Sequence, residues 1–305
     1  MWNCAGKTIL KQRLWKKAEM GFKELLKEAL KNKLKPEELG LLPSGFQAIG
    51  NIIILNLNKK LKKHKKEIAQ EILKIFPRIK TICNKKAGIK GKFRKPSIEI
   101  LAGKNTEAIT KENNCLYKFD VKKLMFAKGN INERIRIAKQ AKPHEIVVDM
   151  FAGIGYFTIL LAKSVARKIY SIELNPEAFK YLKENLKLNK IENKVEAINT
   201  DCKKEIAKLK KRGVKADRIV MGYLPPPRQY IPDAIKIAKK NTIIHYETLL
   251  REDNENNKQE DIEKDMSMIK KQAEKCGFKA RLLQAARVKN YKPHVAHYTL
   301  DVQLG

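Results

Sequence analysis

Three acidic residues, Asp149, Glu173 and Asp201, each close an apolar run of strand length, and this arrangement is typical of a nucleoside site. Successive parallel strands end at one edge of their sheet, where α/β proteins bind ligands. Glu173 comes 24 residues after Asp149, a spacing that suits a carboxylate holding two ribose hydroxyls. Asp201 is placed to reach an adenine amino group. We therefore expect the three carboxylates to form one site for an adenosyl ligand.

A glycine-containing turn follows the first of these strands, in 147-VVDMFAGIGYF-157. Gly153 and Gly155 allow the backbone to approach a ligand closely, and the N-terminus of the next helix favours a negative group. A dinucleotide fingerprint would require a third glycine at the position of Thr158. The turn therefore disfavours NAD.

A proline-rich loop follows the expected fourth strand, in 219-IVMGYLPPPRQY-230. Its prolines end any strand or helix, because each fixes φ and removes a hydrogen-bond donor. In many amino-group methyltransferases, a polar residue that holds the target nitrogen stands before the prolines. Leu224 stands there in this chain. The loop has the position of a catalytic loop but lacks that polar side chain.

The net charge indicates a polyanionic partner. The 305 residues include 66 Lys and Arg against 33 Asp and Glu, a formal charge of +33. Lysine enrichment also follows high-temperature life or genomic base composition, but that bias usually brings glutamate with it. Nucleic acid is therefore the expected partner.

Other broad classes of protein are disfavoured. No apolar run approaches the roughly 20 residues that span a bilayer, so we expect no membrane insertion. The five cysteines are scattered without a C-x-x-C pair, which argues against a metal site and for a reducing cytoplasm.

The order of expected elements predicts an α/β fold with a mostly parallel, doubly wound sheet. Strands are expected at 145–151, 168–174, 194–201, 217–223 and 242–248, with helices at 155–166, 176–189, 203–212 and 231–240. The polar stretch 250–261 is expected to be a mobile loop that opens a helix at 262–277. Two last strands, 278–291 and 295–304, could insert antiparallel.

The chain is expected to have three parts. Residues 1–44 read as a basic helical segment, residues 45–130 as a small α+β domain that binds RNA or links the others, and residues 131–305 as the Rossmann-like catalytic domain. We expect a monomer.

The D-x-F-x-G-x-G turn resembles the first motif of class I S-adenosylmethionine-dependent transferases. Together with 173-ELNP-176, 218-RIVMGY-223 and 244-IHYE-247, the segment 124–157 resembles the tRNA wybutosine-synthesising protein 2 family, in its archaeal form. A related family, the tRNA guanine-37 N1-methyltransferases, shares the same sheet. Its fourth strand ends Asn-Leu-Pro, whereas this chain has Gly222-Tyr223-Leu224, so the amide that helps position guanine is missing.

The resemblance implies S-adenosylmethionine as cofactor and tRNA as partner, bound through its anticodon loop. It implies transfer of the 3-amino-3-carboxypropyl group to 4-demethylwyosine at position 37, with release of methylthioadenosine. Methyl transfer to guanine 37 is the alternative. A basic RNA-binding protein with a vestigial cofactor fold is disfavoured by the three intact carboxylates.

The resemblance also implies which residues contact the cofactor. Asp149 is expected near the amino group of the methionine moiety, and Arg134 near its carboxylate. The expected cofactor-binding set is Ala127, Arg134, Asp149, Phe151, Gly153, Gly155, Glu173, Asp201, Cys202 and Gly222. Ala127 stands where the family usually has serine, and Cys202 where it often has asparagine.

No catalytic residue is assigned from the sequence, and the two candidates are Arg134 and His245. For each there is a structural alternative. Arg134 could be an ordinary helix-surface arginine, and His245 a histidine whose ring nitrogens are engaged within the core.

Overall fold

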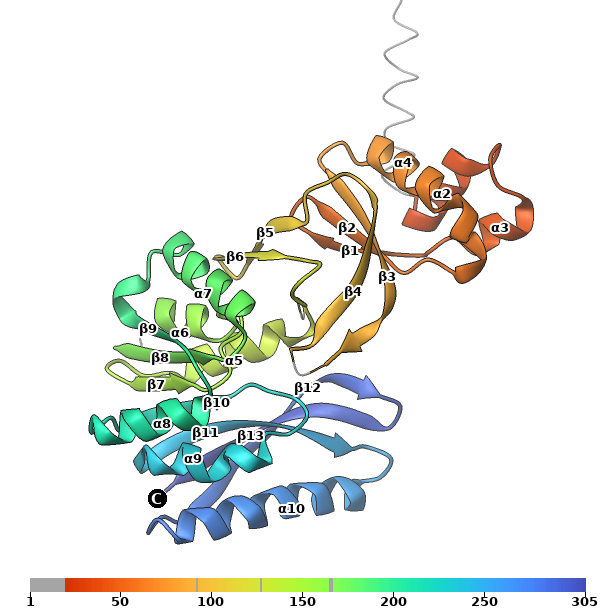
Figure 1. Cartoon of the computed structure of the whole chain (residues 1–305). Coiled ribbons are helices and arrows are strands. Elements are labelled where there is room, and N and C mark those ends of the chain that lie inside the picture. Colours follow the sequence, from red (N-terminus) through yellow and green to blue (C-terminus); the bar gives the residue numbers. More distant parts are fainter. Residues whose placement is uncertain (1–19, 92, 127, 165–166) are drawn as a thin grey trace, which may run out of the picture. The chain divides into compact units, whose positions relative to one another are not determined.

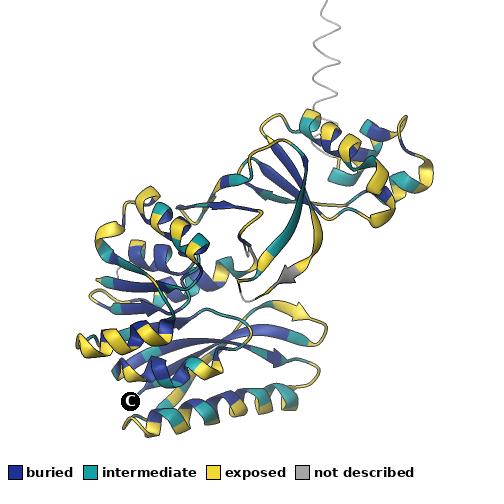
Figure 2. Ribbon diagram, viewed as in Figure 1, coloured by how far each residue is buried: buried dark blue, intermediate teal, exposed yellow. Residues whose placement is uncertain are grey.

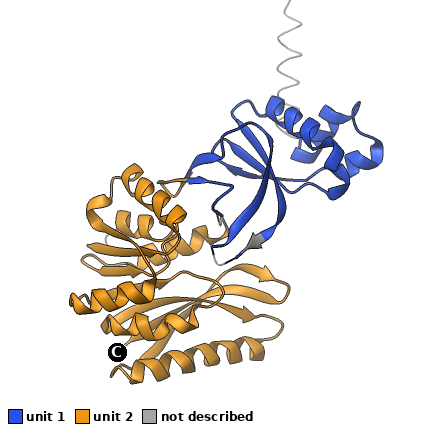
Figure 3. Ribbon diagram, viewed as in Figure 1, with its two compact units in different colours: residues 1–110, 119–125 blue, residues 111–118, 126–305 orange. Residues whose placement is uncertain are grey.

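The computed structural model describes residues 20–91, 93–126, 128–164 and 167–305 and divides the chain into two compact units (Figures 1 and 3). Unit 1 comprises residues up to 110 together with 119–125. Unit 2 comprises 111–118 and 126–305. Much of the basic segment expected at the N-terminus, residues 1–19, lies outside the described residues.

Unit 1 is a small sheet packed against helices. The strand order is β1-β2-β3-β4, in which β2 and β3 are parallel and the other pairs antiparallel. Its elements are α2 (Phe22–Leu30), α3 (Pro36–Gly40), β1 (Gln47–Ile49), β2 (Ile52–Leu55), η1 (Lys59–His64), α4 (Lys65–Ile75), β3 (Thr81–Lys90) and β4 (Lys95–Ala102). Leu26 of α2 shares one apolar core with Ile53 and Ile68, so the helix that begins at Phe22 folds with this sheet.

Unit 2 is built on a seven-stranded sheet with the order β12-β13-β11-β10-β7-β8-β9. Strands β7 to β11 run parallel, whereas β13 lies antiparallel between β11 and β12. The strands are β7 (Ile146–Asp149), β8 (Lys168–Glu173), β9 (Val195–Asn199), β10 (Ala216–Met221), β11 (Ala238–Arg251), β12 (Ala280–Lys292) and β13 (Val295–Leu304). The Rossmann-like sheet and the antiparallel insertion of the tail are confirmed.

Helices cover both faces of this sheet (Figure 1). They are α5 (Ile131–Gln140), α6 (Thr158–Ser164), α7 (Pro176–Leu188), α8 (Cys202–Lys211), α9 (Ile231–Lys236) and α10 (Glu255–Glu274). Burial follows the layers, with the strands buried and the outer helix faces exposed (Figure 2). None of the described helices combines the length and apolarity needed to cross a bilayer. Two further strands, β5 (Glu107–Glu112) and β6 (Cys115–Asp120), pair with each other.

Two expected boundaries are wrong. The stretch 250–261 is not a loop, because β11 continues to Arg251 and α10 begins at Glu255, where Asn254 accepts a hydrogen bond from the Asn257 amide (2.8 Å). Its polar residues lie on the exposed side of a helix, a pattern that composition alone does not separate from a loop. The helix expected to reach 240 ends at Lys236, because Ala238 already pairs with β10.

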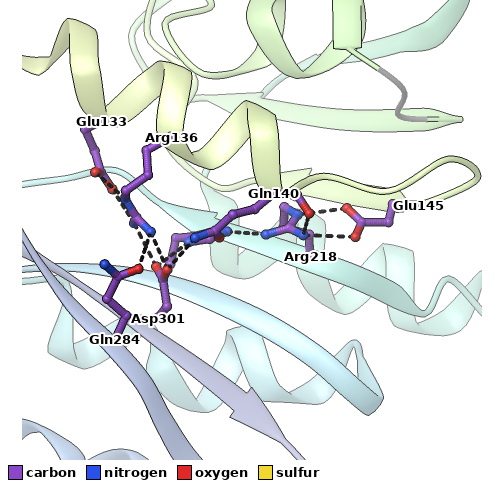
Figure 4. A network of polar contacts seen from close by, with 8 residues as sticks. Glu133, Arg136, Gln140, Glu145, Arg218, Gln284 and Asp301 are labelled. Atoms are coloured by element: carbon purple, nitrogen blue, oxygen red, sulfur yellow. Dashed lines mark hydrogen bonds and ion pairs between the residues drawn. The ribbon is translucent and has the colours of Figure 1, made fainter.

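A buried charged network joins α5 to the sheet (Figure 4). Arg218 of β10 is fully buried, and its guanidinium donates to both carboxylate oxygens of Glu145, at 2.8 and 2.9 Å. It also donates to the Gln140 carbonyl (2.8 Å) and to Nε2 of His245 (2.6 Å). The last turn of α5 is therefore held where β7 begins.

The network continues along α5 through Asp301 of β13. Arg136 donates to both oxygens of Asp301 and of Glu133, and Gln140 donates to Asp301 at 3.1 Å. Figure 4 shows Gln284 beside them, accepting from Arg136 (3.3 Å). Burial opposes ionisation of Asp301, but the hydrogen bonds from Arg136 and His245 hold its pKa below the usual range.

Replacing Arg218 with methionine is expected to lower the free energy of unfolding by about 3–5 kcal/mol, because Glu145 is left buried without its cation. Urea unfolding measures the change. The matched control is Lys239→Met, which breaks the partly exposed pair with Asp217 and should change stability by no more than about 1 kcal/mol. Equal effects of the two substitutions would contradict a structural role for the network.

Candidate active site

The carboxyl ends of β7, β8 and β9 bring the three predicted carboxylates to one edge of the sheet. Asp149 is the last residue of β7, Glu173 is the last residue of β8, and Asp201 lies two residues beyond β9. These three strands are adjacent and parallel, so their ends face the same side. The edge carries negative charge where the sequence places the adenosyl ligand.

Glu173 holds the glycine turn. One of its oxygens accepts from the Gly153 amide (2.7 Å) and the other from the Asn175 amide (2.6 Å). Gly153 has φ +59° and Gly155 φ +97°, conformations that favour glycine. Burial raises the pKa of Glu173. The same carboxylate can fix the turn and offer its remaining lone pairs to a diol.

Asp149 is fully buried in a hydroxyl-lined position. It accepts a hydrogen bond from the Thr158 hydroxyl (2.7 Å), which lies 2.8 Å from the Ser171 hydroxyl, and from the Phe151 amide (3.3 Å). Burial, with the nearby negative charge of Glu173, raises the pKa of Asp149 to about 7. Within the described part of the chain neither carboxylate forms an ion pair, so the site suits a ligand that brings its own positive charge.

Asp201 has a second task as the N-cap of α8. One of its oxygens accepts from the Lys203 amide (2.9 Å), which leaves the other oxygen for a ligand. Burial raises the pKa of the neighbouring Cys202 to about 12, so its thiol stays protonated. Cys202 is therefore suited to packing against a ligand rather than to nucleophilic chemistry.

Three aromatic rings gather near this edge. The Phe151 ring lies 5.2 Å from that of Tyr223 and 5.1 Å from that of Tyr230, measured between centroids. The Lys203 ammonium lies 5.1 Å from the Tyr230 ring. Among these residues, a cofactor contact was expected for Phe151 alone. The two tyrosines frame the proline-rich loop, so the loop adds flat apolar surface beside the carboxylates.

The proline-rich loop is anchored to α10. Arg228 donates to a carboxylate oxygen of Asp265 (2.9 Å), and the other oxygen of Asp265 accepts from the Thr248 hydroxyl (2.6 Å). Asp265 is almost fully buried. The loop is therefore tied to two neighbouring elements as well as stiffened by Pro225–Pro227.

Gly222, at the end of β10, is packed against the first motif. A Cβ atom built on Gly222 would lie 2.6 Å from Cε2 of the buried Phe157 ring. A larger residue would require that ring to move. The position therefore presents backbone and no side-chain amide to a bound base.

Arg134 lies buried beside the glycine turn. It pairs with Glu112 (2.7 Å), and its guanidinium lies 4.6 Å from the centroid of the Tyr156 ring. Arg134 is therefore not the helix-surface arginine that the sequence left as an alternative, and its positive charge is paired with the carboxylate of Glu112. Ala127 lies outside the described residues.

His245 is fully engaged within the buried network. Nε2 accepts from Arg218, so Nδ1 carries the proton and donates to Asp301 (2.6 Å). Burial lowers the pKa of His245 against the opposing effect of Asp301. Because both ring nitrogens are occupied, His245 has no free lone pair for a substrate proton, and we assign it a structural role.

Replacing Asp149 with asparagine is expected to raise the free energy of unfolding of the cofactor-free protein, and to raise it more at pH 8 than at pH 5. The folded pKa of about 7 exceeds the usual 3.8, so ionisation opposes folding increasingly as the pH rises from 4 to 7. The slope is about 1.4 kcal/mol per pH unit. Urea unfolding of both proteins at the two pH values measures it. A stability difference independent of pH would show that Asp149 ionises normally in the fold.

Comparison with known families supports this geometry. The model of the TRM5/TYW2 methyltransferase domain matches residues 108–281, and that of the TYW2 N-terminal domain matches residues 26–106. A Pyrococcus horikoshii protein named tRNA(Phe) (4-demethylwyosine(37)-C(7)) aminocarboxypropyltransferase is 37% identical, over 93% of this chain and 98% of its own. A Pyrococcus abyssi tRNA (guanine(37)-N(1))-methyltransferase Trm5b is 34% identical, over 88% and 78%.

Solved structures of TYW2 and Trm5 proteins are also similar to this chain. P. horikoshii TYW2 in complex with MeSAdo superposes with a TM-score of 0.77 at 34% identity, covering 93% of this chain and 99% of that one. A complex of aTrm5 and tRNALeu gives 0.72 at 31% identity, covering 92% and 78%. With its three strand-end carboxylates, its glycine turn and these matches, the chain belongs to the TRM5/TYW2 family.

Proposed function

We propose that this protein transfers the 3-amino-3-carboxypropyl group of S-adenosylmethionine to C7 of 4-demethylwyosine at position 37 of tRNA(Phe). The proposal depends mainly on the absence of a side chain at Gly222. The site has the carboxylates of an adenosyl pocket, yet the position that helps hold guanine in the related methyltransferases has no side chain. The full-length similarity to an aminocarboxypropyltransferase supports the same choice.

The residues at the strand ends fit this cofactor. Asp149 would meet its ammonium group, Glu173 its ribose hydroxyls and Asp201 its adenine. A buried carboxylate without a cation is stabilised when a ligand brings one, because an opposite charge nearby favours ionisation. The sulfonium supplies three electrophilic carbons, and the protein selects among them by which one it holds next to the acceptor.

The aromatic rings and the basic surface fit an anticodon loop. RNA loops are read through splayed bases that stack on aromatic side chains and through phosphate contacts. Tyr223 or Tyr230 would stack on such a base. In unit 1, Lys60, Lys62 and Lys66 are exposed and suited to phosphates.

Methyl transfer to guanine 37 is the second candidate, favoured by the 34% identity to Trm5b. Both reactions use the same cofactor and the same tRNA position, so the acceptor base and the group transferred to it distinguish them.

The cytoplasmic location and the monomeric state remain predictions. Cys83, Cys115 and Cys202 are buried as free thiols, which suits a reducing compartment. Among the described residues no group of His, Cys, Asp or Glu could hold a metal ion.

Single-turnover reaction with S-adenosylmethionine and tRNA carrying 4-demethylwyosine at position 37 is expected to yield methylthioadenosine and an aminocarboxypropyl mass gain on the tRNA. Mass spectrometry of both products measures it. In a parallel reaction with tRNA carrying unmodified guanine at position 37, S-adenosylhomocysteine with a methyl gain would mean that the second candidate is correct. Unmodified tRNA that still binds the protein would leave only an RNA-binding role.

Replacing Glu173 with glutamine is expected to weaken S-adenosylmethionine binding by roughly 10- to 100-fold, because charge-assisted hydrogen bonds contribute about 1.5–3 kcal/mol. Calorimetric titration gives the dissociation constant. Glu192→Gln, at an exposed glutamate of η3 (Glu192–Lys194), serves as the control and should bind like the wild type. Unchanged affinity in Glu173→Gln would remove Glu173 from the cofactor site.

A further inference from the structure

A second group of buried polar side chains lies on β11 and β13, and the described residues leave several of its atoms without hydrogen-bond partners. Glu247, His297 and Thr299 are each at most 4% exposed. The atoms without a hydrogen bond are Oε1 of Glu247, both ring nitrogens of His297 and the hydroxyl of Thr299, although Nε2 of His297 lies at ion-pair distance from the other oxygen of Glu247. Leaving a buried polar group unsatisfied costs about 1–3 kcal/mol, so such a cluster requires an explanation.

The register places these side chains together. Glu247 pairs with Thr299 across the antiparallel ladder, and His297 lies two residues from Thr299 on the same face. Oε2 of Glu247 lies 3.2 Å from Nε2 of His297. The second carboxylate oxygen, Oε1, remains without a partner in the described part of the chain. The group therefore combines a free acceptor with an adjacent imidazole.

The cluster lies at the active-site end of β11. Met221 pairs with Tyr246, so Glu247 is one step beyond the last paired residue, level with Gly222. A Cβ built on Gly129 would lie 2.8 Å from Cδ of Lys289, the residue opposite His297. The short helix η2 (Lys128–Asn130) therefore packs against Lys289, next to His297 in the ladder.

The proposed reaction requires a proton acceptor. A carbon–carbon bond forms between C7 of the acceptor base and the γ-carbon of the aminocarboxypropyl group. The carbon–sulfur bond breaks, and both of its electrons stay on sulfur in methylthioadenosine. C7 carries a hydrogen, so restoring the aromatic ring releases one proton to a base.

In the other buried carboxylates near this edge, both oxygens already accept hydrogen bonds or are assigned to the cofactor. Both oxygens of Glu133 accept from Arg136, and both oxygens of Asp301 accept from arginine, histidine or glutamine. Asp265 is held by Arg228 and Thr248. Asp149 and Glu173 are assigned to the cofactor. Asp201 is likewise assigned to the cofactor, through its adenine. Among the described residues discussed at this edge, Glu247 has an oxygen without a hydrogen-bond partner and no role in holding the cofactor.

We propose that Glu247 is the base that takes the C7 proton, with His297 positioning its carboxylate. This inference rests on the proposed aminocarboxypropyl transfer. General bases contribute about 10²–10⁴-fold to a rate. Glu247→Gln keeps the size of the side chain but removes the acceptor charge, so the single-turnover rate is expected to fall by at least about 100-fold.

The decisive readout is a hydrogen isotope effect. With tRNA carrying protium or deuterium at C7, Glu247→Gln is expected to show a primary isotope effect that exceeds that of the wild type, because proton removal becomes limiting. Its S-adenosylmethionine affinity should be unchanged, and Glu247→Asp should recover part of the rate. The control is Glu252→Gln, because Glu252 is engaged by Arg287 (2.7 Å) and Tyr298 (2.6 Å); its rate should stay close to that of the wild type.

A Glu247→Gln rate close to that of the wild type would overturn the proposal. So would a loss of cofactor affinity that accounts for the whole effect, because Glu247 would then hold the cofactor. A rate loss without the isotope effect would make the cluster structural and also overturn it. If the wild type itself forms no aminocarboxypropyl product, the proposed function fails instead, and the two failures are distinguishable.

Discussion

The burial of Arg218 is the constraint on which the rest of unit 2 depends. A guanidinium in the middle of a sheet is tolerated only when all its donors are met, because an isolated charge in a protein interior is strongly unfavourable. Glu145, Gln140 and His245 accept hydrogen bonds from all three of its nitrogens, and Asp301 extends the same network to Arg136. These contacts fix α5 against the sheet and thereby place its N-terminus beside the active-site edge.

The active-site edge contrasts with that network. Each charge in that network is paired. Asp149, which is fully buried, and Glu173, which is half-buried, have no cation among the described residues. Backbone amides and hydroxyls partly compensate for this, and Glu173 at the same time holds the glycine turn. Carboxylates held in such an unfavourable environment are typical of a site that binds a positively charged ligand. Glu247, on β11 two strands from Asp149, also has one carboxylate oxygen without a hydrogen-bond partner among the described residues.

Much of this could be predicted from sequence. The alternation of apolar strands and amphipathic helices placed β7 to β11 within a few residues, and the strand ends located Asp149, Glu173 and Asp201. The start of α10 was missed because a polar helix turn and a polar loop have the same composition. Thr158 and Ser171, which surround Asp149, were also missed, since hydroxyl residues carry no spacing signal.

Local sequence patterns were enough to predict the class of chemistry. Strand periodicity, glycines in one turn and acids at strand ends are local patterns, and each follows from neighbouring residues. Which buried polar side chains have all their hydrogen bonds, and which lack one, became clear from the folded structure. His245 and Glu247 stand two residues apart on one strand, and their types suggest similar roles. Partners from β10 and β13 engage both nitrogens of His245, whereas one oxygen of Glu247 has no hydrogen-bond partner among the described residues. The difference arises because hydrogen bonding depends on residues distant in the chain.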